Sequence, residues 1–140
     1  MVSRADFVAA AREWLDTPYH HQGRLKGVGV DCGGVLVMLA KQFGLSEYDA
    51  TGYKRQPDGS LEEHCAREMQ AIPIAAIQPG DVLSFKWSDR SSHIAIVTAV
   101  EEEGIFILHA YIKNRKVVEH RLDTAWMTRI SGAYHLPGVE

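Results

Sequence analysis

Apolar residues at helical spacing open the chain: Phe7, Ala10, Ala11, Trp14 and Leu15. A helix would gather these side chains on one face. Ser3, with Asp6 three residues later, is typical of an N-cap followed by a capping acid. Thr17 precedes Pro18, which disfavours a helical conformation at Thr17. We therefore predict a helix that begins after Ser3 and ends near Asp16.

The longest apolar run, Val35–Ala40, follows directly on a glycine pair. A run of this kind suits a buried strand or a buried helix, and periodicity alone does not separate the two. The segment continues to Phe43 without a break, and Gly44 then offers a C-cap. This length favours a buried central helix over Cys32–Phe43, with Cys32 in its first turn.

The second half of the chain changes from helical to strand-like patterning. Ser60 with Glu63 resembles a capping box, which predicts a helix over Leu61–Met69. Short alternating segments then follow Pro79-Gly80: Val82–Trp87, Ile94–Val100, Ile105–Ile112, Lys116–Arg121 and Ile130–His135. Helices followed by several short strands indicate an α+β fold, with an antiparallel sheet packed on the helices. No linker or repeat divides residues 1–140, so we expect one domain.

The composition narrows the class of protein. The chain has 140 residues, of which 46% are hydrophobic and 24% are charged, values typical of a folded domain. The formal net charge of -3 gives no electrostatic reason to expect a nucleic-acid partner. No run of residues is apolar and long enough for a signal peptide or a bilayer span. We therefore expect synthesis in the cytoplasm, with any export by another route.

Cys32 is the candidate nucleophile. A helix N-terminus favours a thiolate through its free N–H groups and its dipole, and the same groups can hold an oxyanion. Gly33 and Gly34 add no side chain there, so a substrate can approach the backbone closely. The plainer alternative is a small buried core cysteine. Cys65 lies within the helix predicted over Leu61–Met69, and we expect both cysteines to be free thiols.

Two of the seven histidines are candidates for the general base. His93 opens one predicted strand after a polar stretch, and His109 lies in the next strand. If these strands pair as a hairpin around Glu102 and Glu103, His93 faces about position 112. His109 would then be a near neighbour that can orient His93, the arrangement expected of a Cys–His enzyme. The alternative for each histidine is a hydrogen-bonded structural residue.

A metal site is the competing interpretation of these residues. His20 and His21, together with Cys32, His93 and His109, could imitate a zinc centre. Their spacing matches no common zinc pattern, so we expect no metal. His64 and Cys65 are predicted to lie on a mostly solvated helix face with the cysteine buried, and no partner is evident for His120 or His135.

Five segments occur in a recognisable order: Thr17–Tyr19, Asp31–Gly34, Gln78–Val82, His93–Val97 and His109. Together they resemble the NlpC-type cell-wall peptidases over nearly the whole chain, and the ordered set is far more specific than any one segment. The resemblance implies a papain-like α+β fold, with the cysteine on a central helix and both histidines on the sheet. It also implies a cysteine peptidase that hydrolyses amide bonds in peptidoglycan stem peptides, between γ-D-glutamyl and a diamino acid, without any cofactor.

The family's site residues carry over by position. Cys32 resembles the nucleophile, His93 the base and His109 the third, orienting residue. Tyr19 matches the tyrosine that assists the oxyanion or the substrate. Asp31 matches the acid that binds the amino end of the stem peptide in some members.

Two departures from the family pattern bear on specificity. Gly33 replaces the usual serine after the nucleophile, which removes a hydroxyl that helps to hold substrate. His20–Gln22 stands where the family often has Arg-Tyr-Gly. The segment Tyr19–Arg24 and the lack of a leader look most like the branch associated with phage tails and gene-transfer particles, which implies phage-tail proteins as partners. The rival functions are a non-catalytic tail module that binds peptidoglycan and a thiol acyltransferase on the same fold.

Overall fold

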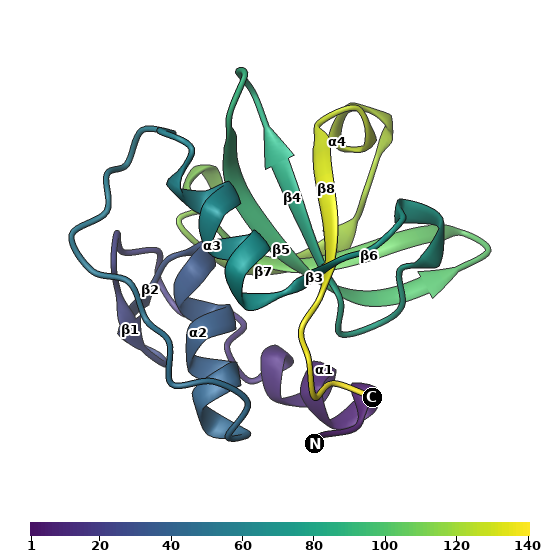
Figure 1. Cartoon of the computed structure of the whole chain (residues 1–140), viewed down its shortest axis with the longest axis horizontal. Helices are drawn as coiled ribbons and strands as arrows, with labels where there is room; N and C mark the ends of the chain where they lie inside the picture. Colours follow the sequence, from purple (N-terminus) through teal and green to yellow (C-terminus); the bar gives the residue numbers. More distant parts are fainter.

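The computed structural model describes all residues from Met1 to Glu140 and confirms the predicted α+β class. Helices α1 (Arg4–Arg12), α2 (Cys32–Gln42) and α3 (Ser60–Glu68) lie together on one side of a six-stranded sheet (Figure 1). The two chain ends meet beside α1, where Val2 and Val139 form a bridge. None of the helices is both long and apolar enough to cross a membrane.

The sheet is antiparallel throughout and has the strand order β3-β8-β4-β5-β6-β7. Its strands are β3 (Gln70–Ala71), β4 (Val82–Lys86), β5 (Ser91–Glu101), β6 (Gly104–Tyr111), β7 (Lys116–Arg121) and β8 (Ile130–His135). The predicted bounds of β7 and β8 are confirmed, whereas β5 begins three residues earlier than expected. The pattern missed the shortest elements, since none is long enough to show a period: β1 (Arg24–Leu25), β2 (Gly29–Val30), β3, α4 (Thr124–Met127), η1 (Ile74–Ala76) and η2 (Ile112–Asn114).

Some of the predicted helix boundaries are confirmed and others are wrong. Ser3 caps α1 as expected, because its hydroxyl accepts from the N–H of Asp6. The helix ends at Arg12, however, and turns carry the chain to Asp16, whose φ of 68° is left-handed. The predicted start of α3 at Leu61 and its predicted capping box are both wrong, because Gly59 is the N-cap in a left-handed conformation with no side-chain cap. Ser60 is therefore the first helical residue, and no Ser60/Glu63 capping box forms.

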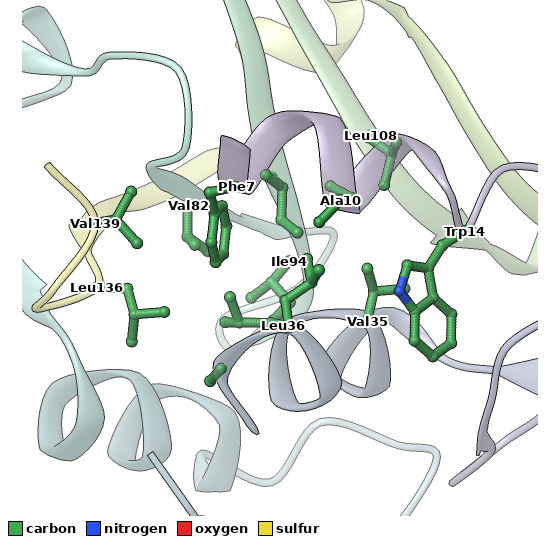
Figure 2. Close-up of a cluster of buried hydrophobic side chains, with 14 of the residues drawn as sticks. Phe7, Ala10, Trp14, Val35, Leu36, Val82, Ile94, Leu108, Leu136 and Val139 are labelled. Carbon is green, nitrogen blue, oxygen red and sulfur yellow. The ribbon is translucent and has the colours of Figure 1, made fainter. Parts of the chain in front are cut away.

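The central helix α2 is confirmed, and it packs on α1 and the sheet. Side chains from all these elements fill the interface (Figure 2): Phe7 and Ala10 of α1, Val35 and Leu36 of α2, Val82, Ile94 and Leu108 of the strands, and Leu136 and Val139 of the C-terminal segment. The other face of the sheet carries a second apolar cluster around Leu83, Phe85 and Ile107. The sheet is thus covered on both faces, as its buried strands require.

A bulge divides the β5–β6 hairpin into two registers. Near the turn, Val100 pairs with Ile105 and Glu101 with Gly104, as the turn at Glu102 and Glu103 predicts. The pairing shifts by one residue at Thr98, which has no partner, so Val97 pairs with Ile107. Beyond the bulge, each β5 residue lies opposite a β6 residue one position earlier than before. Because neighbouring residues of a strand point to opposite faces, this shift changes which side chains of the two strands share a face.

The shift places His93 and His109 on one face of the sheet. In the register without a bulge, His93 would face position 112, and His109 would point to the opposite face. Beyond the bulge, Ile96 pairs with Leu108, and this register continued towards His93 reaches Tyr111, whose ring centroid is 5.5 Å from that of His93. The expectation that the two histidines are neighbours is confirmed, but the register predicted at His93 is wrong by one residue.

The two glycines after Cys32 are predicted to respond differently to substitution. A Cβ atom at Gly34 would lie 2.5 Å from the carbonyl oxygen of Gly23 and 2.7 Å from Val30, whereas a Cβ atom at Gly33 meets nothing closer than 3.9 Å. Gly33→Ala should therefore hold or raise the melting temperature, since alanine stabilises a helix by up to about 1 kcal/mol relative to glycine.

Gly34→Ala should lower the melting temperature by several degrees, roughly 2–4 °C for each kcal/mol in a domain of this size. Thermal unfolding followed by circular dichroism measures both variants against the wild type. Equal melting temperatures for the two variants would show that the loop before α2 does not pack on Gly34 as described.

Candidate active site

Cys32 is the first residue of α2, and its sulfur lies against backbone donors. Asp31 caps the helix, because its Oδ1 accepts from the N–H of Gly34 at 2.8 Å. The N–H groups of Cys32, Gly33 and Ile94 lie beside the sulfur and favour its anion. The sulfur therefore sits where the N-terminus of α2 crosses the start of β5, one residue along that strand from His93.

Burial nevertheless keeps the thiol protonated. Desolvation, together with the negative charge of Asp31, raises the pKa of Cys32 to about 11 despite the backbone donors. The helix N-terminus favours the thiolate, as the sequence argument expected, but burial, which that argument left out, outweighs it. Cys65 is also a free thiol, as expected, and burial raises its pKa to about 12.

A cavity of about 180 Å³ opens beside Cys32, between α2, α3 and the loop that joins them. Four of the predicted site residues lie in its wall: Tyr19, Asp31, Cys32 and Gly33. His64 lies there too, so it is more than part of a solvated helix face. Burial, and then the charges of Cys32 and Asp31, raise the pKa of Tyr19 to about 12, so its hydroxyl keeps its proton and can donate.

Asp31 forms the polar wall of this cavity. Its Oδ1 also accepts from Arg24 Nη1 at 3.0 Å, and its Oδ2 accepts from the N–H of Gln22 at 2.8 Å and from the Tyr53 hydroxyl. The carboxylate is therefore fully hydrogen-bonded within the protein. The sequence analysis missed Arg24 and Tyr53, since both lie in irregular segments and reach Asp31 only in the folded chain.

Three histidines on adjacent strands form a continuous hydrogen-bonded row. Nε2 of His93 on β5 lies 2.6 Å from Nδ1 of His109 on β6. Nε2 of His109 lies 2.9 Å from Nε2 of His120 on β7. Two nitrogens have no partner inside the row: Nδ1 of His120, which contacts the carbonyl oxygen of Arg121, and Nδ1 of His93. No partner for His120 was evident from the sequence, because its approach to His109 depends on the β6–β7 register.

Aromatic side chains enclose the row. Trp126 lies against all three imidazoles, with centroid separations of 6.2, 5.2 and 5.6 Å to His93, His109 and His120. Tyr111 stacks on His109 at 5.1 Å. This apolar cover excludes water from the hydrogen bonds between the rings, which strengthens them and penalises charge on any ring.

The two inner histidines are accordingly neutral. Burial lowers the pKa of His93 to about 3 and the pKa of His109 to about 2, and repulsion from a charged His120 acts in the same direction. No hydrogen bond joins Cys32 and His93 in this structure. The Cys32 thiol therefore lies neutral beside the N–H of Ile94, and the neighbouring residue His93 carries a neutral imidazole. The two groups form no ion pair before the reaction.

The residues that imitate a zinc centre in the sequence do not form one cluster, because His20 and His21 have partners other than the row that contains His93 and His109. His20 is exposed, and Nε2 of His21 lies 3.0 Å from the carbonyl oxygen of Tyr53. No group of three or more His, Cys, Asp or Glu side chains is arranged to hold a metal ion. His135, for which no partner was expected, contacts Asp81 at 2.9 Å.

Comparisons with known proteins agree on the family. Residues 16–134 match the profile described as the NlpC/P60 family. A Bacillus cereus NlpC/P60 family protein superposes with a TM-score of 0.70 at 21% identity, over 94% of this chain and 40% of that one. The NlpC/p60 domain of the peptidoglycan hydrolase SagA gives 0.65 at 22%, over 96% and 100%.

NlpC1 from Trichomonas vaginalis gives a TM-score of 0.71 at 14% identity, over 95% of this chain and 44% of that one. The chain thus spans about two fifths of the B. cereus and T. vaginalis proteins and the whole SagA domain. These likenesses confirm the papain-like α+β fold. A search of curated proteins found no match.

The buried neutral histidines predict a loss of stability in acid. In the unfolded chain both titrate near pH 6.5, whereas in the folded chain their pKa values are about 3 and about 2. Below pH 6.5 the unfolded state binds more protons, so the stabilisation is present above that pH and falls as the pH drops.

Between pH 7.5 and pH 5.5 the free energy of unfolding should fall by about 1–3 kcal/mol from these two groups. Urea denaturation at both pH values measures it. A His109→Gln variant should show a smaller fall, whereas His20→Gln, at an exposed position, should match the wild type. A fall that His109→Gln leaves unchanged would contradict the burial of a neutral ring at this position.

Proposed function

Because the chain belongs to the NlpC/P60 family, whose members are typically peptidoglycan hydrolases, we propose that it is a cysteine peptidase acting on peptidoglycan stem peptides. Cys32 is the nucleophile, His93 is the general base and His109 positions His93. The observation that carries this proposal is the buried row of histidines, which ends one residue along β5 from the N–H that contacts the Cys32 sulfur.

The proposed reaction is acyl transfer through a neutral pair. His93 takes the proton from Cys32 as the sulfur attacks the substrate carbonyl, because a thiolate–imidazolium pair is costly in this buried setting. The protonated His93 then passes its proton to the leaving amine, and water attacks the thioester with His93 again as base. Hydrolysis returns both groups to their neutral forms.

The oxyanion is held by donors already directed at the sulfur. The N–H of Cys32 lies at the free N-terminus of α2, where backbone donors stabilise developing negative charge. Tyr19, in the same cavity wall, keeps its proton at neutral pH and supplies a second donor. The buried site strengthens both interactions relative to water.

The substrate lies in the cavity beside Cys32, with Asp31 facing the amino end of the stem peptide. Asp31 is paired with Arg24, whose Nε also contacts Asp49 at 3.1 Å. A substrate amine therefore has to displace one of the donors that already contact the Asp31 carboxylate. The scissile bond is the amide between γ-D-glutamyl and a diamino acid, which the family resemblance supports. Gly33 leaves the backbone open to close approach.

Delivery to the cell wall by a phage tail or gene-transfer particle is part of the same proposal. Its support is the sequence of Tyr19–Arg24, which resembles that branch of the family. Tail proteins would then be the partners, with the enzyme made in the cytoplasm and incorporated into the particle.

Defined stem peptides test the reaction directly. Purified protein is incubated with L-Ala-γ-D-Glu-diamino acid peptides, with and without an added amine, and the products are identified by mass spectrometry. We expect cleavage at the γ-D-glutamyl bond by water even when the amine is present. Cys32→Ala should abolish turnover, and His93→Ala should lower kcat on the order of 10²–10⁴-fold because the general base is lost.

Glu102→Gln, at an exposed position in the β5–β6 turn and outside the cavity, is the control and should keep wild-type turnover. A folded wild-type protein that binds these peptides and leaves them intact would favour the non-catalytic tail module. Transfer of the acyl group to the added amine would favour the acyltransferase.

A further inference from the structure

The outer end of the histidine row is fixed by a backbone carbonyl. Nδ1 of His120 lies 2.9 Å from the carbonyl oxygen of Arg121. A carbonyl oxygen only accepts hydrogen bonds, so Nδ1 of His120 must carry a proton. In the neutral ring the other nitrogen, Nε2, is then unprotonated and acts as an acceptor.

This constraint passes along the row without ambiguity. Since Nε2 of His120 accepts, Nε2 of His109 must donate across the 2.9 Å contact. Nδ1 of the neutral His109 is then an acceptor, so Nε2 of His93 donates across the 2.6 Å contact. Nδ1 of His93 is left with a free lone pair, which is the form a general base requires.

We propose that His120 is a positioning residue that sets the protonation pattern of His109 and His93 and so holds His93 in its basic form. The proposal rests on the proposed function for the role of His93, but it assigns a group that the sequence analysis left without a partner. His120 acts through two rings and touches neither Cys32 nor the cavity.

Protonation of His120 reverses the row. A charged His120 has N–H groups on both nitrogens, so Nε2 of His109 must accept. Nδ1 of His109 then donates to Nε2 of His93, and the remaining proton of His93 moves to Nδ1, where it blocks the lone pair. The two inner rings stay neutral, so one proton at the surface end switches off a base two rings away.

The surface end is open to such control. His120 is partly exposed and shares a shallow hollow with Arg12 of α1, Glu101 of β5 and Glu119 of β7. Arg12 and Glu119 are paired at 2.9 Å, and the guanidinium of Arg121 donates to the carbonyl oxygen of Glu103 at 3.0 Å. Glu101 forms no salt bridge, so it adds an unpaired negative charge on this side of His120.

Three substitutions at position 120 separate a positioning role from a structural one. His120→Gln supplies an amide oxygen that can accept from His109, and it should keep kcat within about threefold of the wild type. His120→Ala leaves room for water, which both accepts and donates, and it should lose about tenfold. His120→Lys offers only donors, imposes the reversed pattern and should lose about a hundredfold or more. Melting temperatures establish that each variant folds.

Two readouts accompany kcat. The rate at which iodoacetamide alkylates Cys32 reports the thiol–imidazole pair without substrate, and it should follow the order Gln, Ala, Lys. The acid limb of kcat/KM should move to lower pH in His120→Gln, because the variant has no His120 to protonate and burial alone still lowers the pKa values of His93 and His109. Glu102→Gln, at an exposed position in the β5–β6 turn, is the control for both readouts.

Equal kcat and alkylation rates for the three folded variants would overturn the proposal, as would an unshifted acid limb in His120→Gln. If the wild type cleaves no stem peptide but alkylation follows the predicted order, the role of His120 stands and the proposed substrate falls. If peptide cleavage is normal and alkylation does not depend on position 120, the proposed function stands and the role of His120 falls.

Discussion

A single unpaired residue in β5 determines whether His93 and His109 can meet. Side chains alternate across a strand, so the two histidines share a face only because Thr98 is bulged out of the ladder. The same bulge leaves Ile94 and Ile96 facing the helices, in the core beneath α2. The register of one hairpin thus supplies both the surface on which α2 packs and the row of imidazoles on the opposite face.

Burial then sets the chemistry that this geometry can perform. The imidazoles have no carboxylate in their row, and aromatic rings cover them, so a positive charge on His93 is poorly solvated. The thiol of Cys32 is likewise held neutral, although backbone donors surround it. These two effects favour proton transfer during attack over a resting ion pair. Because the rings are neutral, the ability of His93 to act as a base depends on which of its two ring nitrogens carries the proton.

Much of the fold can be predicted from local patterns in the sequence. The uninterrupted apolar segment after Cys32 predicts α2, and alternation predicts five of the six strands of the main sheet. Cys32 stands out because it begins α2, and His93 stands out because it follows a polar stretch at the start of an alternating segment. The loop sequences gave no sign that Arg24 and Tyr53 contact Asp31, because these contacts exist only in the folded chain.

The remaining misses share a cause, which is that pairing between distant segments leaves no local signal. Thr98 is a favourable strand residue, so nothing in its neighbourhood marks a bulge. His120 has polar neighbours and becomes significant only once β7 pairs with β6. The effect of burial on Cys32 was missed for a similar reason, since helix position is visible in the sequence whereas burial under the rest of the fold is not.

The central claim is that the row of histidines leaves Nδ1 of His93 unprotonated, and the ring nitrogens report it directly. In ¹⁵N-labelled protein at neutral pH, long-range ¹H–¹⁵N correlation distinguishes protonated from unprotonated ring nitrogens for each histidine. The account predicts unprotonated Nδ1 in His93 and His109 and protonated Nδ1 in His120. A protonated Nδ1 with an unprotonated Nε2 in His93 would contradict it.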